Sequence, residues 1–374
     1  MPGVLEEHHD YLILQHRHAL FAQAIAKIVQ PGDSVADLGC GFGVLGIQCL
    51  QAGAAHVYGI DRTDAIEIAR ETVRREGLGD SYTCIRASSF RAELPEPVDV
   101  VICDHVGFFG IDYGIIAMLE DARRRMLKHG GKVIPRQIAL QVAGVSSDAC
   151  RALATAWSQA PIPPEYAWLD SYAANTKHAV DLTREDLCSQ SMALGRVRLD
   201  EDNAEALEFA AQIAITRDCR LDGLAGWFHC ELADDIWMNN SPLAEDSIGR
   251  SQAFFPLVTP VEVCAGDIIS LSFKIFHEHP FISWNADFPG DQPRQSMTTW
   301  KSTILTQADL AAQTGAALSP NPLGRARAAL HTLLDGTRSA QQIESALRAM
   351  EPPLFPSDDE LRRFVKAELS VTSA

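Results

Sequence analysis

The order of apolar and polar residues divides the chain into three stretches. Over the first 136 residues, short apolar runs alternate with segments whose apolar residues recur at helical spacing. The helical segments are Tyr11 to Val29, Leu45 to Ala52, Asp64 to Glu76 and Ile115 to Leu127. The strand-like runs are SVADLG, HVYGID, YTCIRA, VDVVICD and KVIP. This alternation predicts an α/β domain over residues 1–136, built on a mainly parallel, doubly wound sheet.

The pattern changes after Pro135. Runs such as IALQVAGV, GWFHCEL, QAFFPLV, DIISLSFKIF and FISWNADF follow one another with turn residues between them. They predict an antiparallel, barrel-like β domain over residues 137–290. A helical segment at about 146–173, which contains Trp157, Tyr166 and Trp168, interrupts its early strands. Apolar stripes at helical spacing in residues 318–374 predict a small helical domain of winged-helix type.

Composition and charge exclude several classes of partner. The 374 residues carry a formal net charge of −17, which repels nucleic-acid phosphates and anionic lipid surfaces. The chain starts MPGVLEEHHD, without the pattern of a secretory signal, and no apolar run reaches the roughly 18 residues that a membrane helix needs. Nine scattered cysteines form no CxxC pair, and His277 and His279 lack a third ligand. We therefore expect a cytoplasmic protein without a metal, a nucleic-acid partner or a membrane partner.

The strongest local motif is VADLGCGFG, a buried strand that runs into a glycine-rich turn before a helix. Gly39, Gly41 and Gly43 let a ligand approach the backbone closely, as in Rossmann-like folds. Asp37, inside the strand, suits a cationic ligand better than a phosphate. Asp61, at the end of the next strand, suits a pair of ribose hydroxyls. Together these residues favour S-adenosylmethionine over a dinucleotide.

From His8 to about residue 288 the chain resembles the protein arginine methyltransferase family. The resemblance rests on HHDYLILQHRHALFAQAI, AGAAHVYGID, ELPEPVDVVICD, LKHGGKVIP and PVEVCAGDIISLSF. It implies a Rossmann-like domain that binds S-adenosylmethionine and releases S-adenosylhomocysteine, followed by a β-barrel. It further implies a homodimer formed through the helical segment at 146–173. Arg17 would hold the carboxylate of the cofactor, a task that suits a guanidinium.

The acceptor region departs from the family pattern. The family's loop with two glutamates reads CDHVGFFGIDYGII here, so Asp104 takes the first glutamate position and Tyr113 the second, with Asp112 beside it. The family's Thr-His-Trp loop would fall in SIGRSQ, where Gly249 and Arg250 stand. Replacing a carboxylate by a phenol weakens a guanidinium site, because bidentate charge pairing is lost.

The rebuilt loop still carries groups able to accept a proton. Asp104 and His105 are the candidate bases and Tyr113 the residue that orients the acceptor, with Phe108 and Phe109 as an apolar wall or, as is more common for such residues, as part of the core. These residues predict methylation, at nitrogen or carbon, of a small-molecule or peptide-derived natural product such as an indole. One alternative is a protein arginine N-methyltransferase with Asp112 as its second acid. Another is a non-catalytic protein that binds partners through its helical tail.

Overall fold

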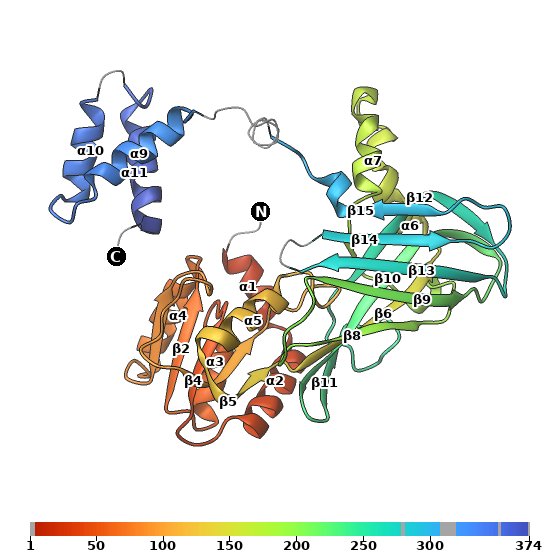
Figure 1. The fold of residues 1–374 in the computed structure, drawn as a ribbon, viewed down its shortest axis with the longest axis horizontal. Coiled ribbons are helices and arrows are strands. Elements are labelled where there is room, and N and C mark those ends of the chain that lie inside the picture. Colours follow the sequence, from red (N-terminus) through yellow and green to blue (C-terminus); the bar gives the residue numbers. More distant parts are fainter. Residues whose placement is uncertain (1–3, 278–280, 307–318, 351–352, 373–374) are drawn as a thin grey trace. The chain divides into compact units, whose positions relative to one another are not determined.

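The computed structural model describes residues 4–277, 281–306, 319–350 and 353–372. The chain divides into two compact units, Met1–Thr303 and Ile304–Ala374. The first unit holds a parallel sheet with its helices and two antiparallel sheets, and the second unit holds helices (Figure 1). The predicted fold class, an α/β domain followed by an antiparallel β domain and a small helical domain, is confirmed.

The N-terminal domain is built on a five-stranded sheet of order β3-β2-β1-β4-β5, in which all neighbouring strands are parallel. Its strands are β1 (Ser34–Leu38), β2 (His56–Asp61), β3 (Tyr82–Arg86), β4 (Val98–Cys103) and β5 (Leu127–Ile134). Its helices are α2 (Gln15–Ile28), α3 (Val44–Gln51), α4 (Ala65–Arg75) and α5 (Ile115–Arg125). Strand order reverses between β1 and β4, so the ligand crevice is expected at the carboxyl ends of these strands.

The β domain consists of two antiparallel sheets. One has the order β7-β12-β10-β6-β8 with β11 paired to β10, and the other has the order β15-β14-β13-β9. The first comprises β6 (Gln137–Val145), β7 (His178–Val180), β8 (Met192–Arg198), β10 (Cys219–Ala233), β11 (Ile236–Asn239) and β12 (Gln252–Val263). The second comprises β9 (Ala206–Ala214), β13 (Ile268–Phe276), β14 (Phe281–Asp287) and β15 (Gln295–Thr298). The second sheet therefore continues past residue 290, where the sequence analysis placed the end of the domain.

Aromatic rings fill the space between these two sheets. The ring centroid of Phe255 lies 5.4 Å from that of Phe273 and 5.2 Å from that of Trp284. Phe109, from the loop after β4, joins them with its centroid 5.0 Å from that of Phe255, and it is fully buried. The interpretation of Phe109 as part of a substrate wall is therefore wrong. Its ring anchors the loop after β4 in the core of the β domain.

The helix expected from Tyr11 to Val29 is two helices. α1 (Val4–Leu12) ends before Leu14, whose backbone (φ −75°, ψ 69°) leaves the helical region, and α2 begins at Gln15. The His18 ring closes the bend, with Nε2 2.9 Å from the carbonyl oxygen of Tyr11. The periodicity of apolar residues continues through the break, and for that reason the sequence pattern did not reveal it.

Helical segments also follow β6 and precede β7. They are α6 (Asp148–Thr155), η1 (Ala156–Ser158), η2 (Pro164–Leu169) and α7 (Asp170–Ala173), and two further short turns are η3 (Arg184–Asp186) and η4 (Thr299–Ser302). Trp157, Tyr166 and Trp168 of this segment are exposed at 40%, 48% and 58%. The structure thus has a helical arm where the sequence predicted one.

The second unit contains α9 (Pro322–Leu333), α10 (Ala340–Arg348) and α11 (Asp358–Thr372). α10 begins at Ala340 because Ser339 and Gln342 form a capping box. The three helices share a small core that includes Leu330, Ile343 and Phe364. The described residues of this unit include no strand, so the winged-helix part of the prediction has no support in them.

Candidate active site

The glycine-rich turn lies between β1 and α3, at the crevice that the strand order predicts. Gly39, Gly41 and Gly43 all have positive φ angles, of 64°, 52° and 83°. A β-carbon at Gly39 would overlap the imidazole of His105, and one at Gly41 would lie 2.7 Å from Nε2 of His8. Both the backbone conformation and the close approach of these rings therefore require glycine here.

Two carboxylates, those of Asp37 and Asp61, accept hydrogen bonds from the backbone at and just after this turn. Asp37 is 1% exposed, and its Oδ2 accepts a hydrogen bond of 2.9 Å from the backbone N–H of Gly46. Burial raises the pKa of Asp37 to about 7. Asp61 accepts from the backbone N–H of Gly41 (3.0 Å) and from both the N–H and the hydroxyl of Thr63 (2.7 Å each). Asp61 thus links the end of β2 to the glycine turn.

Arg17 and Asp104 form a buried ion pair through Nη2 and Oδ2, with side chains 5% and 12% exposed. Arg17 belongs to α2, and Asp104 is the residue directly after β4. Two atoms of the pair are buried without a hydrogen-bond partner among the described residues, the Nε donor of Arg17 and the Oδ1 acceptor of Asp104. The sequence predicted both residues for the site, but not their mutual contact.

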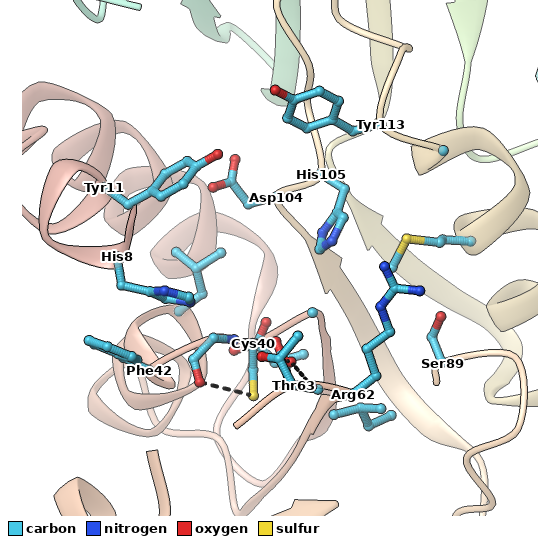
Figure 2. A pocket seen from close by; sticks show the side chains of 18 of the residues that line it. His8, Tyr11, Cys40, Phe42, Arg62, Thr63, Ser89, Asp104, His105 and Tyr113 are labelled. Atoms are coloured by element: carbon cyan, nitrogen blue, oxygen red, sulfur yellow. Dashed lines mark hydrogen bonds between the residues drawn. The ribbon is translucent and has the colours of Figure 1, made fainter. Parts of the chain in front are cut away.

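His105 points away from Asp104, toward the glycine turn and Arg62, whereas Asp104 points toward Tyr11 (Figure 2). Burial is the main cause that lowers the pKa of His105, so the ring is neutral near pH 7. Because His105 covers Gly39, it borders the cofactor side of the site. The structure therefore separates the two predicted bases by direction, although both face one cavity.

The acceptor side is formed by the rest of the loop after β4. Asp112 is 2% exposed and forms an ion pair with Lys177, and its Oδ1 accepts a 3.0 Å hydrogen bond from the N–H of Phe109. Phe108 packs edge-on against Tyr113, with centroids 5.8 Å apart. The Nζ of Lys177 lies 5.8 Å from the centroids of both rings. Asp112 also lines the cavity, but its carboxylate is already paired with Lys177 and is not open as a second carboxylate.

The β domain supplies residues to this side that the sequence analysis did not assign to the site. Arg250 donates from Nη2 to the hydroxyl oxygen of Tyr11 (3.1 Å). Asn240 is fully buried, and its Nδ2 donates to the carbonyl of Phe108 (2.9 Å) and to that of Ser251 (2.8 Å). The sequence did mark Arg250, because it departs from the family's Thr-His-Trp pattern at the acceptor region. Neither Lys177 nor Asn240 has a local motif that reveals its role.

A single cavity of about 670 Å³ brings the predicted residues together. The predicted residues that line it are Arg17, Asp37, Gly39, Gly41, Asp61, Asp104, His105 and Tyr113. Gly43 does not line it and instead precedes α3 in a left-handed conformation. His8, Tyr11 and Phe42 also line it, and the rings of His8 and Phe42 stack at 4.2 Å. α1 therefore contributes one wall of the cavity.

The residues present fit S-adenosylmethionine. The unpartnered Nε of Arg17 could donate to its carboxylate, Asp37 could accept from its ammonium group, and Asp61 lies where ribose hydroxyls are held in Rossmann-like folds. Among the described residues, no group of three or more His, Cys, Asp or Glu side chains could hold a metal ion. In the same part of the chain, no helix is long and apolar enough to cross a lipid bilayer.

Comparisons with known proteins match this chain to methyltransferases. The family model for ribosomal protein L11 methyltransferase (PrmA) matches residues 18–149. Probable protein arginine N-methyltransferase 6 of Arabidopsis thaliana is 36% identical over 115 residues, which is 31% of this chain and 26% of the relative. Arginine N(omega)-methyltransferase of Streptomyces achromogenes subsp. streptozoticus is 26% identical over 262 residues, covering 68% of this chain and 72% of the relative. This chain spans between 26% and 32% of the length of the first six curated relatives.

Solved structures share the fold. The Trypanosoma brucei PRMT1 enzyme-prozyme heterotetrameric complex with AdoHcy superposes with a TM-score of 0.69 at 20% identity, covering 79% of this chain and 98% of that one. Protein arginine methyltransferase 10 of Arabidopsis thaliana gives 0.65 at 21% identity, with coverages of 76% and 95%. The predicted resemblance, enzyme class and cofactor are confirmed for the N-terminal domain. This chain has the fold of protein arginine methyltransferases, and its cofactor domain is an S-adenosylmethionine-dependent methyltransferase domain.

Proposed function

We propose that this protein methylates a nitrogen of a guanidine group, as in arginine, with S-adenosylmethionine as donor. The observation that carries the proposal is the buried Arg17–Asp104 pair, which keeps one donor and one acceptor unused. The donor, Arg17 Nε, suits a carboxylate of the cofactor. The acceptor, Asp104 Oδ1, suits an N–H of the substrate. The relatives named for arginine methylation support this acceptor over the indole predicted from the sequence.

For this reaction the protein has to position the acceptor nitrogen and stabilise its charge. S-adenosylmethionine supplies an electrophilic methyl group when it is bound. Methylation replaces an acceptor N–H by N–CH₃ and releases S-adenosylhomocysteine, so the acceptor gives up one proton, which a carboxylate hydrogen-bonded to that N–H can accept and pass to solvent. Asp104 is in that position, and its carboxylate stabilises the positive charge of the methylated guanidinium. Arg17 holds Asp104 in place until a cofactor carboxylate competes for the guanidinium.

An aromatic heterocycle is a second candidate acceptor. The specific observation in its favour is a group of three rings around Arg250, one from α1 and two from the loop after β4. The Arg250 Cζ lies 5.4 Å from the centroids of Tyr11 and Phe108 and 5.6 Å from that of Tyr113. Such rings can stack with a flat substrate. The ion pair of Asp112 with Lys177 bears on the choice between a guanidine and a heterocycle. Because of this pair, a guanidinium would meet Asp104 alone and not two open carboxylates.

The test is a transfer assay with labelled S-adenosylmethionine and four acceptors: L-arginine, an arginine-containing peptide, L-tryptophan and indole. Mass spectrometry of the product identifies the methylated atom. Label in either arginine acceptor supports the proposal, and label confined to the indole ring replaces it by the second candidate. An absence of S-adenosylhomocysteine binding in calorimetry, with no label in any acceptor, refutes both. Asp61→Ala is the matched variant, and we expect it to lose cofactor binding.

We also propose that the protein is a cytoplasmic homodimer that contacts its copy through the arm of α6, η1, η2 and α7. The exposed rings of Trp157, Tyr166 and Trp168 support this surface, since large exposed apolar side chains gathered on one segment favour association. All nine cysteines are free, which fits a reducing compartment. Sedimentation equilibrium of the Trp168→Ala variant beside the unchanged protein tests the dimer, and an unchanged monomer in both contradicts it.

A further inference from the structure

The acceptor side of the cavity carries more positive than negative charge. Its carboxylates are already engaged, Asp104 with Arg17 and Asp112 with Lys177. Of Arg17, Lys177 and Arg250, Arg250 is the one without an ion pair among the described residues. Among the residues that the structure describes, no carboxylate lies within ion-pair distance of Arg250. Its side chain meets the hydroxyl of Tyr11 and three aromatic rings instead.

Arg250 is also deeply buried. The residue is 9% exposed, and its Nη1 is buried without a hydrogen-bond partner in the described part of the chain. Burying a guanidinium without a counter-ion is unfavourable, so proteins pair such groups or use them to bind anions. Tyr11 and Tyr113, which enclose Arg250, both line the cavity. Arg250 does not itself line the cavity, so an anionic group there must displace the Tyr11 hydroxyl, the hydrogen-bond partner of Nη2, to reach this guanidinium.

The electrostatic influence of Arg250 reaches several residues of the site. Beside burial, which is the larger cause, its charge lowers the pKa of Arg17 and the pKa of Lys177. It is also among the charges that lower the pKa of His105. A cation whose field acts on three neighbouring basic groups makes the acceptor side attractive to an anion.

We infer that the acceptor carries a carboxylate, which Arg250 binds while the reacting nitrogen faces Asp104. This inference rests on the proposed function and narrows its substrate class to small carboxylic acids, such as a free amino acid, or to the C-terminal residue of a peptide. Arginine inside a polypeptide lacks that carboxylate and is a poorer acceptor. Arg250 is a specificity residue in this scheme, and it contacts the acceptor away from the reacting atom.

Matched pairs of ligands test the carboxylate directly. L-arginine is compared with L-argininamide, and L-tryptophan with L-tryptophanamide, because each pair differs only in carboxylate against carboxamide. Binding is measured by calorimetric titration into the S-adenosylhomocysteine complex of the full chain. We expect at least one acid to bind about ten- to a hundredfold more tightly than its amide, which is the usual range for a charge-assisted hydrogen bond. Equal binding within both pairs, or binding of none of the four ligands, overturns the inference.

Two variants assign the preference to Arg250. Arg250→Gln should bring the ratio of acid to amide affinity close to one, and Arg250→Lys should retain part of it. Arg196→Gln, at an exposed arginine of β8, is the matched control and should behave as the unchanged protein. An acid preference that survives in Arg250→Gln overturns the assignment. So does a loss of S-adenosylhomocysteine affinity with an unchanged acid-to-amide ratio, because Arg250 would then only hold Tyr11 and α1.

The cofactor titration separates this inference from the proposed function. If the unchanged protein does not bind S-adenosylhomocysteine, the proposed function fails and the inference falls with it. If the protein binds S-adenosylhomocysteine and methylates an acceptor without preferring the acid, only the inference is refuted. Urea unfolding of each variant beside the unchanged protein shows whether a change in affinity reflects a loss of folded protein.

Discussion

Asp104→Asn changes the charge of the central ion pair while keeping the shape of the side chain. In this variant Arg17, whose side chain is 5% exposed, becomes a buried cation without its counter-ion. Removing one partner of a buried pair costs about 3–5 kcal/mol. Because Asp104 keeps 12% exposure, we expect the lower end, about 3 kcal/mol. At about 2 °C per kcal/mol for a domain of this size, the melting temperature should fall by roughly 6 °C.

The same variant should leave cofactor binding intact or improve it. Without Asp104, the guanidinium of Arg17 has no competing carboxylate, so the carboxylate of S-adenosylhomocysteine pairs with it unopposed. We expect an affinity equal to that of the unchanged protein or up to about tenfold tighter, a gain of about 1.4 kcal/mol. Methyl transfer should fall by about a hundredfold or more, as for the loss of a group that handles a proton. Saturating ligand should therefore raise the melting temperature of the variant more than that of the unchanged protein.

Arg17→Gln is the matched variant, because it breaks the same pair from the other side. It should also lower the melting temperature, but its affinity for S-adenosylhomocysteine should fall about tenfold or more. Calorimetric titration and thermal unfolding with and without ligand provide both readouts. If Asp104→Asn weakens cofactor binding as much as Arg17→Gln does, Asp104 holds the cofactor and not the acceptor. The division of labour proposed for the pair would then be refuted.

Three further predictions concern the cofactor side and the loop after β4. Burial raises the pKa of Asp37 to about 7, so at pH 6 only about a tenth of the carboxyl is ionised, and calorimetry should find S-adenosylhomocysteine bound about tenfold more weakly at pH 6 than at pH 8. Since the pKa of Asp37 is raised in the folded protein, its contribution to stability is present at low pH and is lost as the pH rises through about 7. Asp37→Asn should remove the pH dependence of both cofactor affinity and stability. Persistence of either dependence in that variant would contradict the assignment. Gly39→Ala should abolish measurable cofactor binding in calorimetry, because a β-carbon overlaps His105 and a left-handed residue costs about 1–2 kcal/mol, and unchanged binding would show that the turn adapts. Asn240→Ala should lower the free energy of urea unfolding by about 2 kcal/mol or more, because it leaves the N–H of Phe228 and the carbonyl of Phe108 unpaired; a loss under about 0.5 kcal/mol would show that water replaces the amide.

The cofactor side could be predicted from the sequence because its residues lie in short motifs on consecutive elements. Asp37 lies in β1, the glycines follow that strand and Asp61 ends β2, all within a span in which strand and helix periodicity are clear. Arg17 lies just upstream on α2, and its place in the cavity agrees with the expectation drawn from the family resemblance. Parallel strands bring their carboxyl ends to one edge, so local motifs are sufficient to place these residues together.

The acceptor side could not be predicted in the same way because its contacts are distant in sequence. Lys177 and Asp112 are 65 residues apart, and Arg250 and Tyr11 are 239 residues apart. The sequence assigned Phe109 only an apolar environment, which both a substrate wall and a domain core provide, and it could not show which ring the core would take. The break between α1 and α2 was likewise invisible, since it depends on the bond between His18 and the Tyr11 carbonyl. Such contacts depend on how the β domain meets the α/β domain.

The hydrogen bonds of Asn240 have a consequence for the design of new acceptor specificities. Its amide joins the backbone of the loop after β4 to β10 and to the segment before β12, so loop and β domain form one hydrogen-bonded unit. Grafting residues 104–114 from a relative would leave that amide facing a foreign backbone. A chimera should therefore exchange this loop together with residues 239–252, and libraries that vary either segment alone will mostly sample misfolded combinations. Recombination between natural relatives is expected to obey the same restriction, with viable crossovers before residue 104 or after residue 252.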